Sequence, residues 1–249
     1  YVDLQAAAYV FLAFYSWENG CNQKQPGWFF LMTLFAGAAI ATNLTTVIIL
    51  PLAFLGLALH GRTCKNLKQT ISQCLILTFG SLLILSPWLV RNYFFTGNPV
   101  APFLMNIFGG ENAINWDVVR SQMQFQYYSS LGMGHSFLDF LLLPINLTFF
   151  SEAHSLKFDG HIGIVYLLLI PALLGLDRKS IPLAIVFSVL LIFWFMQTQY
   201  IRLLAPAFAF LSVLLVTGLT QLFQKNKIAK KEKLFLTSIL TLGLLFNTS

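Results

Sequence analysis

Two arginines stand where they could do chemistry at a membrane surface. Arg202 opens an apolar stretch in residues 199–206 (QYIRLLAP), and Arg91 follows Pro87 and Trp88 at the end of another. A guanidinium in such a place can hold a phosphate with its planar fork of donors. A charge at the start of an apolar helix is costly and usually has a partner, which favours a functional Arg202. Arg91 could equally extend its side chain to lipid headgroups.

Acidic and histidine side chains supply the other candidates. Asp3, in the opening residues YVDLQ, could act as a base or a metal ligand, although a carboxylate is also favoured at a helix N-terminus by the helix dipole. A polar cluster precedes a later apolar run and contains Glu152, His154, Lys157, Asp159 and His161. These types suit divalent ions, but the spacing matches no site that we can name, and a solvated loop is the alternative. Cys21, Cys64 and Cys74 also lack metal-ligand spacing.

The composition indicates the elements that must position these residues. The mean hydropathy is +0.74, and 57% of the residues are hydrophobic while 10% are charged. Soluble domains carry about 25% charged residues, so this is a polytopic helical membrane protein. The apolar runs do not alternate, which excludes a transmembrane β-barrel.

We expect about eight membrane segments in a single transmembrane domain over residues 1–249. They cover residues 2–17, 28–41, 45–59, 70–89, 161–176, 181–196 and 203–223, and an eighth begins at residue 234. Residues 90–160 form one long segment between membrane helices, beginning with a turn at Thr96-Gly97-Asn98-Pro99. Within it, residues 136–150 are too short, and too interrupted by Pro144, to span the bilayer. The chain opens without Met and ends inside an apolar run, which predicts a fragment of a longer protein.

The net charge of +6 does not predict a nucleic-acid partner, because the positions of the basic residues along the chain are explained by membrane topology. If Asp3 faces outside, the inner face carries Lys24, Arg62, Lys65, Lys68, Arg178, Lys179, Lys225, Lys227, Lys230, Lys231 and Lys233. The outer face carries only Arg91, Arg120, Lys157 and Arg202. This asymmetry agrees with the positive-inside rule and places the candidates for chemistry outside. The functional face is therefore expected on the non-cytoplasmic side of the membrane.

Several stretches, in order, resemble the membrane glycosyltransferases of the GT-C type, which include protein O-mannosyltransferases and the aminoarabinose transferase of lipid A. Residues 36–43 (AGAAIATN) are similar to a small-residue helix that ends in a polar pair, where Asn43 departs from the more usual Lys. Residues 87–93 (PWLVRNY) with 96–103 (TGNPVAPF), then 143–148 (LPINLT) with 160–163 (GHIG), and finally 199–206 look like further segments of that family. Each motif is loose, and their shared order carries the resemblance over most of the chain.

The resemblance implies transfer of a sugar from a polyprenyl-phosphate donor to a lipid, glycan or protein acceptor outside the membrane. Arg202 and Arg91 would contact the donor phosphate. Asp3 would match a second acidic position and is the catalytic candidate here, because the defining acid of the family would precede Tyr1. A divalent metal ion is a candidate cofactor with unknown ligands. The competing interpretations are a transporter or flippase of lipid-linked sugars and a non-catalytic membrane subunit.

Overall fold

The computed structural model describes residues 2–23, 25–64, 66–101, 103–109 and 118–225. Within these ranges the secondary structure is helical, without a β-strand, and an isolated bridge joins Glu152 and Phe158. The chain divides into two compact units, residues 1–128 and 129–249. The all-α class is therefore confirmed, and the single transmembrane domain stays a prediction.

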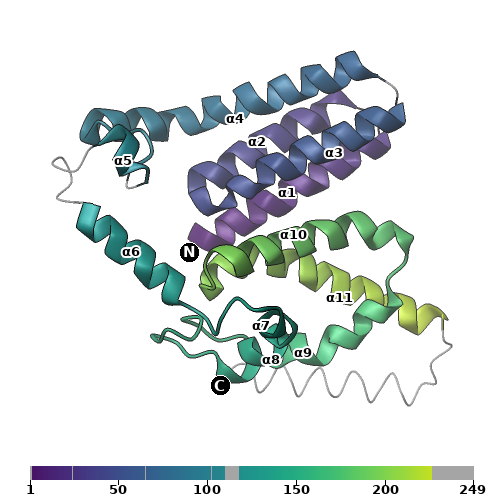
Figure 1. The fold of residues 1–249 in the computed structure, drawn as a ribbon. Helices are drawn as coiled ribbons and strands as arrows, with labels where there is room; N and C mark the ends of the chain where they lie inside the picture. The colour runs from purple at the N-terminus through teal and green to yellow at the C-terminus, as the bar shows by residue number, and fades with distance from the viewer. Residues whose placement is uncertain (1, 24, 65, 102, 110–117, 226–249) are drawn as a thin grey trace. The chain divides into compact units, whose positions relative to one another are not determined.

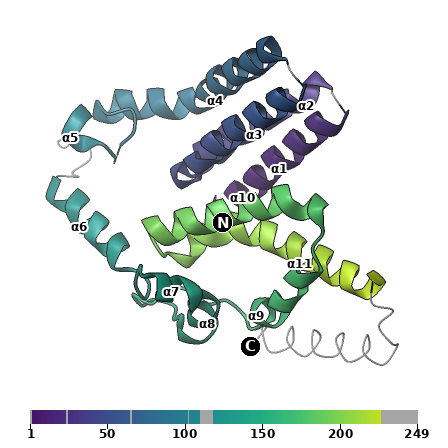
Figure 2. The same ribbon diagram turned by 45° about the vertical axis from the view of Figure 1, so that its right-hand side comes forward.

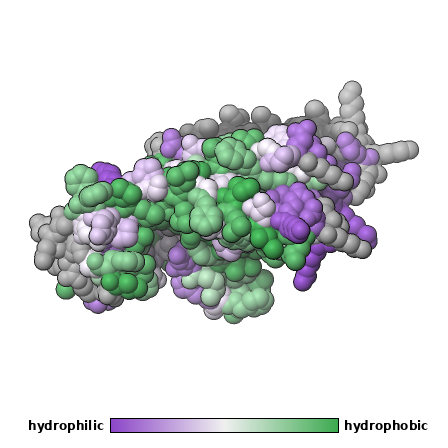
Figure 3. All heavy atoms as spheres, turned by 90° about the horizontal axis from the view of Figure 1, so that it is seen from above, coloured by the Kyte–Doolittle hydropathy of each residue, from purple (hydrophilic) through white to green (hydrophobic). Residues whose placement is uncertain are grey.

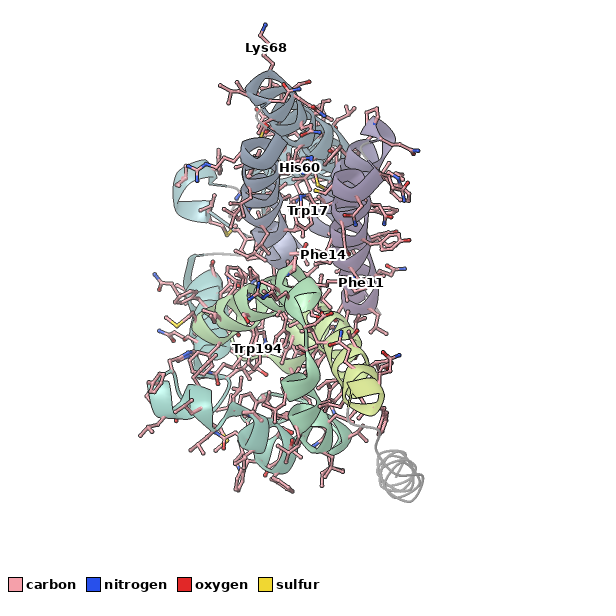
Figure 4. The ribbon with its side chains drawn as sticks, turned by 90° about the vertical axis from the view of Figure 1, so that its right-hand side faces the viewer. Phe11, Phe14, Trp17, His60, Lys68 and Trp194 are labelled. Atoms are coloured by element: carbon pink, nitrogen blue, oxygen red, sulfur yellow. The ribbon has the colours of Figure 1, made fainter. Side chains whose placement is uncertain are left out.

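The first unit is a bundle of long helices. Helix α1 (Val2–Gln23) packs against α2 (Pro26–Thr42), and both α2 and α3 (Ile49–Cys64) pack against α4 (Leu67–Thr96), as Figures 1 and 2 show. The buried side chains of α1 repeat every three or four residues and are Ala6, Ala7, Val10, Ala13, Phe14, Ser16 and Gly20. This spacing places them on one helical face, which covers α2. The rings of Phe14 and Trp17 on α1 lie against each other with centroids 5.7 Å apart. In Figure 4, Lys68 at the start of α4 points away from the helices.

Small residues allow α2 and α4 to approach closely. Ala36 and Ala39 are fully buried in α2. A Cβ added at Gly37 would lie 2.9 Å from Cδ1 of Ile84 and 3.1 Å from Cα of Ser81, both on α4. The small residues of this stretch therefore let the two helices pack closely, as small residues do in membrane proteins.

Helix α4 continues past the point where the sequence was expected to leave the helix. We expected the helix to end near residue 89, but it runs to Thr96, with Pro87 inside it. A proline within a membrane helix is tolerated when neighbouring groups satisfy the freed carbonyl. The helix ends at Gly97, whose φ of +73° favours glycine and whose N–H donates to the carbonyl of Tyr93 at 2.8 Å. The predicted turn is thus confirmed at its place, and the helix ends seven residues later than expected.

Short elements follow this turn. They are α5 (Met105–Phe108) and α6 (Val118–Ser130). Asn98 is fully buried and stabilises the turn, because its side-chain amide donates to the carbonyl of Phe103 at 2.9 Å and its Oδ1 accepts from the N–H of Val100 at 2.9 Å. The turn is therefore a rigid connection.

The second unit begins with short elements and ends with two long helices. Its short elements are α7 (Phe137–Leu141), α8 (Leu143–Ile145), the π-helix η2 (Asn146–Phe150), α9 (Val165–Leu169) and the 3-10 helices η3 (Ile170–Gly175), η4 (Arg178–Ser180) and η5 (Ile201–Leu204). The long helices α10 (Ile181–Gln197) and α11 (Ala205–Lys225) pack together, and η3 packs on α11. As expected, residues 136–150 form no continuous helix.

Four helical stretches in the described part of the chain are long and apolar enough to cross a membrane. They are Leu44–Arg62, Leu67–Thr96, Arg178–Gln197 and Ile201–Gln224, and Pro26–Thr42 and Val165–Gly175 are shorter apolar helices. Large apolar side chains on these helices are exposed, such as Leu83 at 74% and Leu174 at 87%. Figure 3 shows apolar residues over much of one face. Exposed apolar surface of this extent suits contact with lipid, so the chain is a multi-pass integral membrane protein. The eighth expected segment lies outside the described residues.

Candidate functional site

Arg202 lies on a short turn between the two long helices of the second unit. The turn follows the end of α10, and Arg202 itself belongs to η5. Its guanidinium carbon lies 5.6 Å from the centre of the Tyr200 ring, and its Nη1 donates to the Tyr200 hydroxyl at 3.2 Å. Arg202 is exposed. The ring and the hydroxyl together hold a solvent-accessible guanidinium in one orientation.

Aromatic packing fixes the backbone of this turn. Indole Nε1 of Trp194 donates to the carbonyl of Tyr200 at 2.7 Å, and the N–H of Ile201 donates to the carbonyl of Phe158 at 2.9 Å. Phe158 is fully buried, and its ring stacks on Trp194 with centroids 6.2 Å apart. Figure 4 shows Trp194 on α10. The segment before Arg202 is therefore joined both to α10 and to the loop around residue 158.

A buried glutamine joins a third segment to the same turn. Gln199 is 1% exposed, its Oε1 accepts from the N–H of Met133 at 3.1 Å, and its Nε2 donates to the carbonyl of Gly134. The N–H of Gly132 donates to the carbonyl of Leu156 at 2.7 Å. Gly132 has a φ of +105°, and an added Cβ would lie 2.6 Å from Cβ and Cδ of Gln199. Only glycine permits this close approach without strain.

This arrangement positions His135, a residue that the sequence reasoning missed. Nδ1 of His135 lies 2.8 Å from the carbonyl oxygen of Phe195, and the imidazole packs edge-on against the Phe195 ring at 5.6 Å. Because a carbonyl only accepts, Nδ1 carries the proton in this contact and Nε2 carries the lone pair. Nε2 of Gln199 lies 3.2 Å from the same Nδ1, a longer contact, and we assign the Nδ1 proton from the shorter contact to the carbonyl oxygen, which cannot donate. The imidazole is exposed.

A capping box follows His135. The hydroxyl of Ser136 accepts from the N–H of Asp139 at 3.2 Å, and Oδ2 of Asp139 accepts from the Ser136 N–H at 2.9 Å. The hydrogen bond from the Ser136 hydroxyl, then that from its N–H, lowers the pKa of Asp139, and the nearby His135 acts in the same direction. The sequence GMGHSFLD (residues 132–139) contained this signal: two glycines before a Ser-x-x-Asp cap.

An apolar cavity of about 220 Å³ lies in the same unit. Its lining includes Leu143, Leu147, Leu191, Leu204 and Leu211. The hydroxyls of Tyr166, which also lines it, and of Ser212 lie 3.3 Å apart.

The cavity lining adjoins the elements that hold His135 and Arg202. Leu204 is two residues after Arg202, within η5. Leu191 is one helical turn before Phe195 on α10, so the two share a face. The short helix that carries Arg202 thus also contributes a residue to the cavity lining.

In the first unit, the side chains of Asp3 and Asn43 are in contact. Nδ2 of Asn43 donates to Oδ1 of Asp3 at 3.1 Å. Oδ1 of Asn43 accepts from the N–H and hydroxyl of Thr45, at 3.0 and 2.8 Å, and so caps η1 (Leu44–Ile48). Asn43 therefore both ends α2 and orients the carboxylate.

Arg91 is exposed on α4, with its guanidinium carbon 5.9 Å from the centre of the Phe95 ring. Asp3 and Arg91 belong to the first unit and Arg202 belongs to the second. The roles predicted for the three residues stay predictions.

The polar side chains at residues 152–161 form their contacts within their own loop. Lys157 and Glu152 form an exposed ion pair of 2.9 Å. Oδ1 of Asp159 accepts from the N–H of His154 at 2.8 Å, and Nε2 of His161 lies 3.4 Å from the N–H of Ala153. Among the described residues, no three His, Cys, Asp or Glu side chains are grouped so that they could hold a metal ion. The solvated-loop interpretation therefore accounts for this cluster.

The fold and these sites define a helical membrane protein whose polar groups collect at helix ends. Its sequence matches the family described as "Domain of unknown function (DUF8201)" over residues 2–208, and the chain belongs to that family. The matched region includes Asp3, Arg91, His135 and Arg202. Neither the curated proteins nor the solved structures contain a match to the chain.

Proposed function

We propose that this protein is a membrane glycosyltransferase of GT-C type that uses a polyprenyl-phosphate sugar donor on the non-cytoplasmic face. The observation that carries the proposal is the apolar cavity of the second unit, whose lining residue Leu204 lies in the same short helix as Arg202. A polyprenyl-phosphate sugar combines an apolar chain with an anionic headgroup. An apolar cavity whose lining shares a short helix with an arginine offers groups that suit both parts.

The chemistry of transfer explains why a fixed arginine would matter. As the bond between the sugar and phosphate breaks, negative charge grows on the phosphate oxygens. A pre-oriented guanidinium stabilises that charge without reorganisation, and Tyr200 holds Arg202 in such an orientation. The roles that the resemblance implies for Arg91, as a second phosphate contact, and for Asp3, as a catalytic carboxylate that Asn43 orients, belong to the proposal on sequence grounds alone. A divalent metal ion remains a candidate cofactor, with no ligand set assigned.

The distribution of basic residues supports the orientation. Arg178 and Lys179 precede α10, whereas Arg202 follows it, so the two ends of this helix differ in basic charge. With Arg178 and Lys179 on the cytoplasmic side, the turn that carries Arg202 faces outside. We also propose that the donor is a lipid of a bacterial plasma membrane. The protein would cross that membrane with about eight segments.

The first test replaces Arg202 in the full-length protein. In vesicles that contain a synthetic polyprenyl-phosphate hexose and a membrane extract as acceptor, release of polyprenyl phosphate is measured. Arg202→Ala should slow release by roughly 100-fold or more, because removing one transition-state donor commonly costs that much. Arg178→Ala, an exposed arginine at the opposite end of α10, should not change it. Equal rates for the wild type and Arg202→Ala would refute the role.

The second test fills the cavity. Leu211→Trp should raise the KM for the donor, because Leu211 lines the apolar space. Leu174→Trp is the matched control, since Leu174 is 87% exposed on η3. Transport of the lipid-linked sugar across the vesicle, without any transfer product, would instead support the flippase interpretation.

A further inference from the structure

The strongest unassigned feature is the lone pair on Nε2 of His135. The Nδ1–H of this residue is committed to the carbonyl of Phe195 at 2.8 Å, so the other ring nitrogen is the basic one. No hydrogen bond to Nε2 is found within the described ranges, and the ring is exposed. When the Nδ1–H is bonded to a backbone carbonyl, the lone pair on Nε2 faces away from that bond and can accept a proton.

A purely structural role would explain only half of this geometry. Phe195 lies in the last turn of α10, and histidine side chains often satisfy the final carbonyls of a helix. That role uses Nδ1 and needs nothing beyond it. However, His135 comes directly after Gly134 in the chain. The buried side chain of Gln199 forms hydrogen bonds with the backbone N–H of Met133 and the backbone carbonyl of Gly134, and so fixes the position of this segment. Such support is expected where the position of a ring matters.

The same glutamine places His135 and Arg202 on one rigid assembly. Gln199 bonds to the backbone just before His135, and it lies three residues before Arg202 in the turn held by Trp194. The Phe195 ring that supports the imidazole also packs against Phe140 at 5.1 Å, and Phe140 precedes the cavity-lining residue Leu143 by three positions. The backbone before the imidazole and the turn that carries the guanidinium are therefore joined through Gln199.

We infer that His135, through Nε2, accepts the proton of the acceptor hydroxyl during sugar transfer, an inference that rests on the proposed function. The O–H bond of the acceptor breaks and its proton passes to Nε2. The acceptor oxygen bonds to the anomeric carbon, and the bond from that carbon to the phosphate oxygen breaks. The electron pair leaves on the phosphate, beside Arg202. The exposed imidazolium then releases its proton to water, which restores the base.

The test uses a substitution that separates the two ring nitrogens. In His135→Asn, the amide nitrogen occupies the place of Nδ1 and can still donate to the Phe195 carbonyl, but the basic nitrogen is lost. In full-length protein in the donor-containing vesicles, this variant should bind the polyprenyl-phosphate hexose and unfold like the wild type. Its rate of polyprenyl phosphate release should be lower by roughly 100-fold or more. His154→Asn, at another exposed imidazole of the same unit, should release at the wild-type rate.

Other outcomes overturn the inference in distinguishable ways. If His135→Asn keeps the wild-type rate while His135→Ala loses it, the imidazole serves only the helix end. A loss of donor affinity in His135→Asn that accounts for its whole loss of rate would show a binding role instead. Loss of transfer in Asp3→Asn, with none in His135→Asn, would assign the base to the first unit. If the wild type consumes no donor, the proposed function fails, and the role of His135 fails with it.

Discussion

Replacing Gly132 by alanine should destabilise the second unit more than an ordinary glycine substitution. The backbone of Gly132 has a φ of +105°, and its missing Cβ leaves the space that the side chain of Gln199 occupies. An alanine Cβ would stand 2.6 Å from both Cβ and Cδ of Gln199, a separation that non-bonded carbon atoms do not sustain. Gln199 must then move, and the hydrogen bonds to Met133 and Gly134 are broken.

The cost has two parts that can be measured separately. A side chain at this positive φ costs about 1–3 kcal/mol. Leaving the buried partners of Gln199 without hydrogen bonds adds about 1–3 kcal/mol for each group left unsatisfied. Gly97→Ala in the first unit isolates the first part, because Gly97 has a φ of +73° and no atom within 4 Å of an added Cβ. We expect about 1–2 kcal/mol for Gly97→Ala and about 3–6 kcal/mol for Gly132→Ala.

The assay is reversible unfolding in mixed micelles, followed by tryptophan fluorescence, with a double-mutant cycle inside the second unit. Gly132→Ala and Gln199→Gly are measured singly and together, because glycine also removes the Cβ of Gln199 that an added Cβ would meet. If the Gln199 side chain is the obstacle, Gly132→Ala in the Gln199→Gly background should cost no more than the backbone part alone. Additive effects of the two substitutions would refute the reasoning, as would equal losses for Gly132→Ala and Gly97→Ala.

Further predictions concern the capping box, the helix contact and the guanidinium. Because the Ser136 bonds lower the folded-state pKa of Asp139, its contribution to stability is present above the ordinary carboxyl pKa and is lost as the pH falls through the lowered value. The difference in unfolding midpoint between the wild type and Ser136→Ala should shrink over that range. Gly175→Leu should lower the unfolding midpoint, because even a Cβ there would lie 2.6 Å from Cγ of Leu222 on α11. Tyr200→Phe removes the hydroxyl that accepts from the guanidinium, so the donor KM should rise several-fold while the free energy of unfolding changes by less than about 0.5 kcal/mol.

Features set by the local sequence were predictable here. The Thr-Gly-Asn-Pro sequence predicted the turn that begins at Gly97. The small residues of α2 are typical of a helix that packs closely on a neighbour, but the sequence did not identify α4 as that neighbour. Helix ends were harder. The run at residues 161–176 reads as one apolar helix, yet the structure has a short α-helix from Val165 that tightens to a 3-10 helix at Ile170. Pro171 lacks the N–H that an α-helix needs there, so the tighter turn replaces it.

Contacts between distant residues could not be predicted from one sequence. Nδ2 of Asn43 reaches a carboxylate 40 residues away, and Gln199 reaches a backbone carbonyl 65 residues away. Arg202 could be predicted as a functional residue because a charge there interrupts an apolar run. His135 did not, because a histidine between polar residues carries no such signal, and only the fold reveals which ring nitrogen is committed.

The turn that carries Arg202 is rigid because a membrane protein must satisfy its backbone where helices end. Between α10 and α11 the chain leaves helical geometry, and its N–H and carbonyl groups need partners that lipid cannot supply. Trp194, Gln199 and the Phe158 carbonyl provide them. The side chains that satisfy this connection also fix Arg202 and the segment before His135. A loop built in this way can place a cation and a base with the accuracy of a helix, so the structural requirement and the proposed chemistry have the same physical origin.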